Sequence, residues 1–78
     1  MDKAQKEQTM ARFGARLRRL RKAIPKLSQE KVALRAGIDR SYYGEIERGE
    51  HNVALINIVR IAGALEVETA ELFREWAP

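Results

Sequence analysis

Hydrophobic residues recur every three or four positions over most of this chain, which is the spacing that places them on one face of a helix. The first stripe consists of Phe13, Leu17, Leu20 and Ile24. It predicts a helix from about Gln8 to Ala23. Pro25 should end that helix, because it lacks a backbone N–H and disfavours helical geometry in the preceding residue.

Two short helices are predicted next, each with residues suited to begin and end it. Ser28 is a good N-cap for a second helix of about eight residues, and Gly37 can adopt the left-handed conformation that ends a helix. Asp39 can cap a third helix over Arg40–Arg48, which Gly49 ends. Two short helices joined by so tight a turn are typical of the helix-turn-helix, whose second helix lies in the DNA major groove.

The remaining residues predict two further helices and no strand. A fourth helix over Leu55–Leu65 should bury one face, consisting of Leu55, Ile58, Ile61, Ala62 and Leu65. A fifth, short helix should run from Thr69 to Trp76. We therefore expect an all-α, five-helix domain over residues 1–78, with residues 1–8 as a polar N-terminal extension.

Charge and composition narrow the function classes. The net charge is +4, and residues 11–26 hold seven basic side chains and no acidic one, which favours a polyanionic partner such as nucleic acid. No apolar run approaches the ~20 residues of a membrane span, and cysteine is absent, so we expect a soluble cytoplasmic protein that does not bind membrane. We find no nucleophile–base pair, cofactor loop or metal cluster, since His51 lacks a second ligand; the sequence predicts neither an enzyme nor a metal or cofactor site.

Separated motifs give the chain a family resemblance. RLRRLRK, LSQEKVALRAGI, IERGE, LINIVRIAGALEV and ELF stand in the order and spacing of the lambda-repressor and Cro type, or XRE family, of helix-turn-helix regulators. The segment DRSYYGEIERGEHNVALINIVRIAGAL most resembles the controller proteins of restriction-modification systems. The resemblance implies a lambda-repressor-like fold with the helix-turn-helix at helices 2 and 3. It also implies a homodimer that binds pseudo-palindromic operators on double-stranded DNA and regulates restriction-modification genes, with RNA polymerase as a further candidate partner.

If the third helix enters the major groove, its first turn and the face that continues it point at base edges. The predicted base contacts are Arg40, Ser41, Tyr42 and Glu45. The guanidinium of Arg40 can bond O6 and N7 of one guanine, whereas Glu45 is as well explained by an exposed or internally paired carboxylate. Tyr43 falls at a position that the family keeps apolar and should lie in the core. The predicted backbone contacts are Gln29, Arg48, His51 and Asn52. Gln29 matches a family position that bonds phosphate or a neighbouring base, and the other three follow the third helix.

Two further predictions concern assembly of the domain. The resemblance implies an ion pair between Arg21 and Glu47 that joins the first and third helices. The apolar arc of the fourth helix is wider than a lone small domain covers, which predicts a homodimer interface. That interface is predicted to contain Ile56, Val59, Gly63, Val67, Phe73 and Trp76. Two alternatives remain: the fifth helix covers this surface within one chain, or the domain is an antitoxin or another protein-binding module of the same fold.

Overall fold

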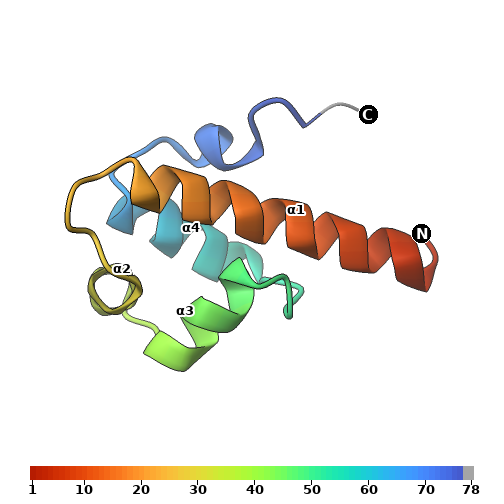
Figure 1. The fold of residues 1–78 in the computed structure, drawn as a ribbon, viewed down its shortest axis with the longest axis horizontal. Coiled ribbons are helices and arrows are strands. Elements are labelled where there is room, and N and C mark those ends of the chain that lie inside the picture. The colour runs from red at the N-terminus through yellow and green to blue at the C-terminus, as the bar shows by residue number, and fades with distance from the viewer. Residues whose placement is uncertain (77–78) are drawn as a thin grey trace.

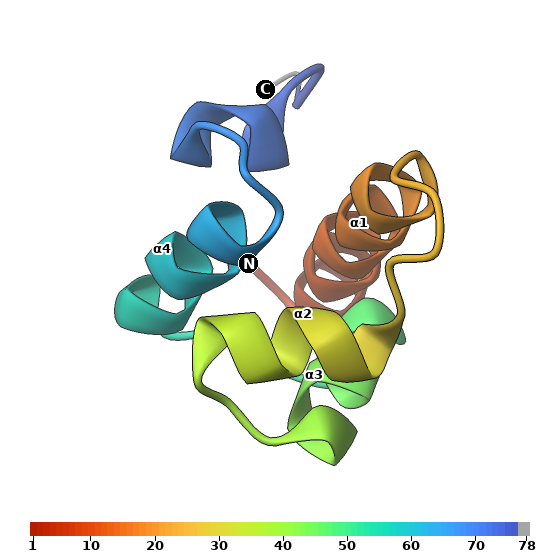
Figure 2. The ribbon, with the colours of Figure 1, turned by 90° about the vertical axis from the view of Figure 1, so that its left-hand side faces the viewer.

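The computed structural model describes residues 1–76 of the 78-residue chain. Over these residues it contains four α-helices and one 3-10 helix and no strand. The elements are α1 (Lys3–Lys22), α2 (Gln29–Ala36), α3 (Arg40–Glu47), α4 (Leu55–Ala64) and the 3-10 helix η1 (Thr69–Phe73). In both ribbon views α1 lies between α3 and the C-terminal segment (Figures 1 and 2). No helix in the described part of the chain is both long and apolar enough to cross a membrane.

The start of α1 differs from the sequence prediction. The Asp2 carboxylate accepts a hydrogen bond from the Gln5 amide at 2.8 Å, and the Gln5 side chain accepts one from the Asp2 amide at 2.8 Å. This capping box starts the helix at Lys3, so the predicted start near Gln8 is wrong. Periodicity could not find these first turns because they bury no apolar side chain, and they project beyond the other helices in Figure 1.

The predicted bounds of α2 and α3 are confirmed to within a residue. The Ser28 hydroxyl accepts from the Lys31 amide at 3.1 Å, and Gly37 ends α2 with a φ of 70°. Asp39 caps α3 by accepting from the Tyr42 amide, and Gly49 follows with a φ of 77°. Figure 2 shows α3 beside α2 on the side of the molecule away from the C-terminus, so the two form a helix-turn-helix.

The core draws on all five elements. Its fully buried side chains are Leu17, Val32, Tyr43, Ile46, Ile61, Leu65 and Leu72. Tyr43 is therefore in the core, as predicted, and burial raises the pKa of its hydroxyl. Leu72 belongs to η1, so the C-terminal segment is part of the hydrophobic core rather than an appendage.

Two predictions about the C-terminal half are wrong. The fifth helix is not an α-helix reaching Trp76: the segment forms i to i+3 bonds, such as the Glu71 amide to the Glu68 carbonyl at 2.9 Å, and it ends at Phe73. Residues 1–76 therefore contain four α-helices rather than five. Leu55 is 70% exposed rather than in the core, because it lies in the first turn of α4, ahead of the residues that reach α2.

Candidate nucleic-acid interface

A polar hollow of about 330 Å³ lies between the N-terminal end of α2 and the outer face of α3. Its lining consists of Gln29, Asp39, Arg40, Ser41, Gly44 and Arg48. Four of these, Gln29, Arg40, Ser41 and Arg48, were predicted from the sequence to contact DNA. The fold therefore brings residues from both helices of the helix-turn-helix to one surface.

The N-terminal turn of α3 is held by Asp39. Its carboxylate accepts hydrogen bonds from the Ser41 hydroxyl and from the Tyr42 amide at 3.4 Å. The bond from Ser41, reinforced by the amide, lowers the pKa of Asp39, so this carboxylate stays ionised at neutral pH. Because the Ser41 proton is engaged by Asp39, the oxygen of Ser41 is left as an acceptor. The neighbouring Arg40 side chain is exposed.

The angle of α3 is fixed by an ion pair to α1. Arg21 donates from Nε to Glu47 Oε2 at 2.7 Å and from Nη2 to Glu47 Oε1 at 3.1 Å, which is the predicted pair in a bidentate arrangement. Arg21 also donates to the Leu27 carbonyl at 3.1 Å. Gln29 joins the network, since its Nε2 donates to Glu47 Oε1 at 3.0 Å. The carboxylate of Glu47, which orients α3, thus also positions the side-chain amide of Gln29 at the hollow.

The network controls the ionisation of both partners. The side chain of Glu47 is only 2% exposed, and burial alone would raise its pKa. Hydrogen bonds from Arg21 and Gln29, together with the charge of Arg21, outweigh burial and hold the pKa of Glu47 below its ordinary value. The bond to Glu47 likewise raises the pKa of Arg21. The pair is therefore ionised and mostly buried beneath the interface.

Gly14 allows α1 and α3 to pack this closely. A β-carbon at Gly14 would lie 2.3 Å from the Ile46 carbonyl oxygen and 2.5 Å from that of Glu47, so no other residue fits without separating the helices. Sequence reasoning missed this position. The available signal was a glycine in the interior of a strongly helical stripe, which usually marks a close backbone approach.

Tyr42 and Glu45 do not line the polar hollow. Glu45 Oε1 lies 2.8 Å from His51 Nε2, and the Tyr42 ring meets the His51 ring edge-on at a centroid distance of 4.9 Å. Asn57 Nδ2 donates to the Tyr42 hydroxyl at 3.3 Å, a contact that sequence reasoning missed. Glu45 is thus paired within the chain in this structure, and its predicted base contact stays a prediction. Tyr42, Glu45 and His51 form a second group beside the hollow.

The other predicted backbone contacts differ in what surrounds them. Arg48 is exposed and donates from Nε to Glu50 Oε2 at 2.8 Å, and this bond raises the pKa of Arg48. Sequence reasoning did not identify Glu50 as its partner. Asn52 is exposed and, with His51, borders a separate apolar hollow of about 200 Å³ beside Phe13.

The residues predicted to form a dimer interface fall into two groups. Ile56 and Val59 are 63% and 51% exposed on α4, and a β-carbon at Gly63 would meet no atom within 4 Å. Val67, Phe73 and Trp76 instead pack at least partly against the chain's own core. Phe73 stacks on Phe13 with a centroid distance of 5.4 Å and stays 40% exposed. Of the two groups, the α4 residues are therefore the more open, and they form the open apolar surface of α4. No group of three or more potential metal ligands occurs within residues 1–76.

A helix-turn-helix with its polar residues gathered at the outer face of the second helix defines a class of DNA-binding proteins. The family model HTH_3, described as helix-turn-helix, matches residues 17–72, so the chain belongs to this family. It is 44% identical over 64 residues to the control protein C.MunI of a Mycoplasma species, covering 82% of this chain and 86% of the relative. It is 42% identical over 60 residues to the control protein C.BamHI of Bacillus amyloliquefaciens, covering 77% and 74%. The crystal structure of the restriction-modification controller protein C.AhdI from Aeromonas hydrophila superposes with a TM-score of 0.81 at 52% identity, covering 85% of this chain and 98% of that one.

Proposed function

We propose that this protein is a cytoplasmic, sequence-specific regulator of transcription that binds double-stranded DNA and controls restriction-modification genes. The observation that carries the proposal is the polar hollow, in which Gln29, Arg40, Ser41 and Arg48 face outward from a helix-turn-helix. The similarity to C.MunI, C.BamHI and C.AhdI supports the restriction-modification assignment. No catalytic role follows from the hollow, so the proposal is a binding function.

Arg40 is the residue to which we assign most of the sequence discrimination. It stands at the first position of α3 with an exposed side chain, and its planar fork matches O6 and N7 of a guanine. Ser41 offers an acceptor oxygen beside it and can serve several bases. Tyr42 is bonded to Asn57, and Glu45 is bonded to His51. We assign both residues secondary base contacts, because each must first give up that bond.

The backbone contacts are assigned to residues at the two ends of the hollow. Gln29 lies at the N-terminus of α2, where free amides and the helix dipole favour a phosphate. Arg48 would exchange its exposed pair with Glu50 for a phosphate, at little cost, because solvated ion pairs are weak. His51 and Asn52 follow in the loop after α3 and are assigned weaker backbone contacts.

We further propose that two copies associate through α4. Ile56, Val59 and Gly63 give an apolar surface with a glycine that permits close approach of a second helix. A two-fold dimer would present its recognition helices about 34 Å apart, one DNA turn, and would read pseudo-palindromic half-sites. Val67, Phe73 and Trp76 would then border this interface rather than form its centre. Whether the bound dimer recruits or blocks RNA polymerase depends on where the operator lies relative to the promoter.

Selection of bound duplexes from a random library tests the proposal directly. We expect an enriched pseudo-palindrome with half-site centres one helical turn apart. Affinity for that duplex should fall with salt, and neutralising about eight phosphates would give a slope of about −7 for the logarithm of the association constant against the logarithm of the salt concentration. Failure to enrich any sequence, or a slope near zero on duplex DNA, would contradict the assignment.

The exposed α4 surface also favours a second candidate, a protein-binding module such as an antitoxin. An apolar helix face of this kind can dock an unlike partner as well as a second copy. Purification from the native cell distinguishes the two: a stable complex with a different polypeptide bound over α4 favours the module, whereas a homodimer that retains operator binding favours the regulator.

A further inference from the structure

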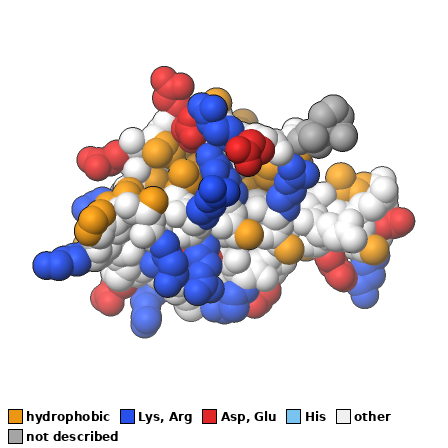
Figure 3. Space-filling view, turned by 45° about the horizontal axis from the view of Figure 1, so that its top comes forward, with side chains coloured by type: hydrophobic (Ala, Val, Ile, Leu, Met, Phe, Trp, Pro, Cys, Tyr) orange, Lys and Arg blue, Asp and Glu red, His pale blue; other side chains and the backbone are white. Residues whose placement is uncertain are grey.

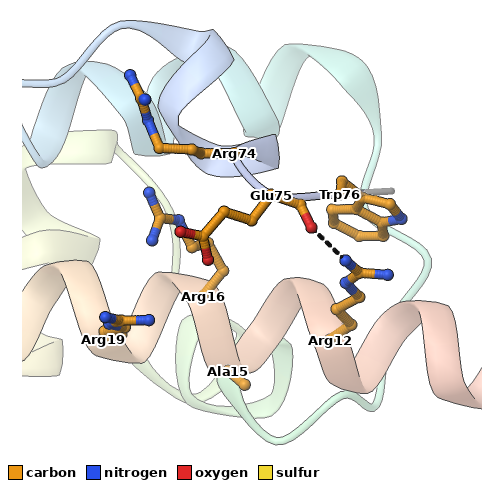
Figure 4. A pocket seen from close by; sticks show the side chains of 7 residues that line it. All are labelled: Arg12, Ala15, Arg16, Arg19, Arg74, Glu75 and Trp76. Carbon is orange, nitrogen blue, oxygen red and sulfur yellow. Dashed lines mark hydrogen bonds between the residues drawn. The ribbon is translucent and has the colours of Figure 1, made fainter. Parts of the chain in front are cut away.

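A second hollow, of about 210 Å³, lies on the other side of α1 from the helix-turn-helix. Its lining consists of Arg12, Ala15, Arg16, Arg19, Arg74, Glu75 and Trp76. Figure 4 shows that Arg12 and Arg16 extend from α1 towards the C-terminal segment. In Figure 3 the Lys and Arg side chains form a band down the middle of this face. The proposed DNA contacts use none of these residues.

Three of the four guanidinium groups are held in place. Arg16 donates to the Glu71 carbonyl at 2.9 Å and to its carboxylate at 3.3 Å. Arg74 donates to the same carboxylate at 3.0 Å. Arg12 donates to the Glu75 carbonyl and lies over the indole ring of Trp76, 5.0 Å from its centroid. A ligand that enters this hollow therefore meets three arginines that contacts within the chain already orient.

The hollow carries more positive than negative charge. Arg19 is exposed at its edge and forms no side-chain hydrogen bond within residues 1–76. Glu71 forms ion pairs with both Arg16 and Arg74. The carboxylate of Glu75 is the other negative charge, and Figure 4 shows its side chain reaching across the hollow towards Arg16 and Arg19.

Glu75 occupies a backbone conformation that is costly for its side chain. Its φ of 63° lies in the left-handed region, which residues other than glycine seldom adopt. This turn places the Glu75 carbonyl on Arg12 and its carboxylate over the arginines. A tethered carboxylate of one charge thus stands where an anion would bind, and a competitor must carry more charge to displace it.

We infer that this hollow binds the phosphate groups of a small, multiply charged phosphate compound, with Glu75 swinging away as the ligand enters. Arginine forks match phosphate oxygens in bidentate geometry, and a phosphate of two or more charges exceeds the single charge of Glu75. The C-terminal segment forms one wall of the hollow, so a small compound fits better than a DNA duplex, which needs an open surface. The site is independent of the proposed DNA contacts because α1 separates the two.

Trp76 supplies the probe, because it is the one tryptophan of the chain and lines the hollow. We would titrate the full chain with inorganic pyrophosphate and follow Trp76 fluorescence, with sodium chloride at matched ionic strength as the reference. The expected result is a saturable change with pyrophosphate that the chloride reference does not reproduce. An identical response to both salts would overturn the inference.

Three variants locate the site. Arg19→Gln should weaken pyrophosphate binding about tenfold, since it removes a charge-assisted bond. Arg18→Gln removes the same charge from an exposed neighbour outside the hollow and should change affinity less than about twofold. Glu75→Gln should strengthen binding several-fold, because the internal competitor is lost. If Arg18→Gln and Arg19→Gln weakened pyrophosphate binding equally, the ligand would respond only to the overall positive charge of α1, and the proposal would be overturned.

A final comparison separates this site from the DNA-binding surface. Arg40→Ala should leave the pyrophosphate titration unchanged although it relaxes operator preference at one base pair per half-site. Circular dichroism would establish that every variant keeps the helical content of the parent. If a short DNA duplex, but not pyrophosphate, changed Trp76 fluorescence in the Arg40→Ala variant, the hollow would be a second nucleic-acid surface and the inference would be wrong.

Discussion

Arg40 and Arg48 border the same hollow but differ in what holds them. Arg48 is paired with Glu50, which gives it a definite position and a partner to release. Arg40 stands beside the ionised Asp39, whose Oδ2 accepts hydrogen bonds from the Ser41 hydroxyl and the Tyr42 amide. The Asp39 cap that starts α3 therefore also positions the two residues that follow Arg40. The residue that predicts the start of the helix thus lies within the candidate interface.

Replacing Arg40 by alanine tests the role assigned to it. We expect preference to relax at one base pair per half-site, by about 1–3 kcal/mol, because the bidentate bond to guanine is lost. Competition among duplexes that differ at single positions measures this effect. Arg48→Ala is the matched control and should weaken all duplexes by a similar factor. If Arg40→Ala weakened binding to all duplexes by the same factor, Arg40 would contact phosphate rather than a base.

A single substitution at Ala54, the N-cap residue of α4, should make the folded chain more stable. It has the extended backbone of an N-cap, with a φ of −65° and a ψ of 146°, but no side chain to accept a hydrogen bond. Ala54→Ser should raise the free energy of unfolding by about 1 kcal/mol, measured by urea denaturation. Ala54→Val provides no acceptor and should give no such gain. Equal stabilisation by both would show that capping is not the cause.

Among the elements, those with local signals were predictable and those set by packing were not. The sequence located α2 and α3 because Ser28, Gly37 and Asp39 act within one turn of their own helix. Periodicity could not find the capped but solvated start of α1, nor could it distinguish an α-helix from a 3-10 turn at Thr69–Phe73.

The candidate site was predictable to a similar extent. Gln29, Arg40, Ser41 and Arg48 followed from the helix-turn-helix frame and meet in one hollow. The pairing of Glu45 with His51 depends on how the loop after α3 folds back, which no local pattern encodes. For the same reason the role of Gly14 became evident only once α3 was placed against α1.

The contact between α1 and α3 depends on the pair of Arg21 and Glu47. Glu47→Ala should lower the free energy of unfolding by about 3–5 kcal/mol, because it leaves the mostly buried Arg21 charge without its counterion. The double variant Arg21→Met with Glu47→Leu should recover most of that loss, since apolar side chains of similar size need no counterion. Chemical denaturation measures both. A double variant no more stable than Glu47→Ala would contradict this reading.

The same pair predicts a pH dependence. The pKa of Glu47 in the folded chain lies below its ordinary value of 4.5, so its stabilising contribution is complete above that pH and is lost as the pH falls through the folded-state pKa. The stability difference between the parent and Glu47→Gln should therefore narrow as the pH falls from about 6 to about 3. Urea denaturation across that range measures it. A difference that stayed constant would mean that Glu47 titrates normally.

At the scale of the whole molecule, the three surfaces to which we assign a role occupy different sides of one small domain. The polar hollow uses α2 and α3, the open apolar residues lie on α4, and the arginine-lined hollow lies between α1 and the C-terminal segment. Because α1 packs against both α3 and η1, it separates the two charged surfaces. Association through α4 would therefore leave the α3 side of each copy facing DNA.

Val59→Lys tests association through α4. The substitution places a charge in the centre of the open apolar surface, where burial against a second copy would remove it from water, so we expect loss of the dimer. Sedimentation measures the mass, and a palindromic operator should then bind with at least tenfold lower affinity, while a single half-site is unaffected. Leu34→Lys is the matched control, because Leu34 is equally apolar and 80% exposed but lies on α2. If both variants remained dimeric and bound the operator as the parent does, the two copies would have to meet elsewhere.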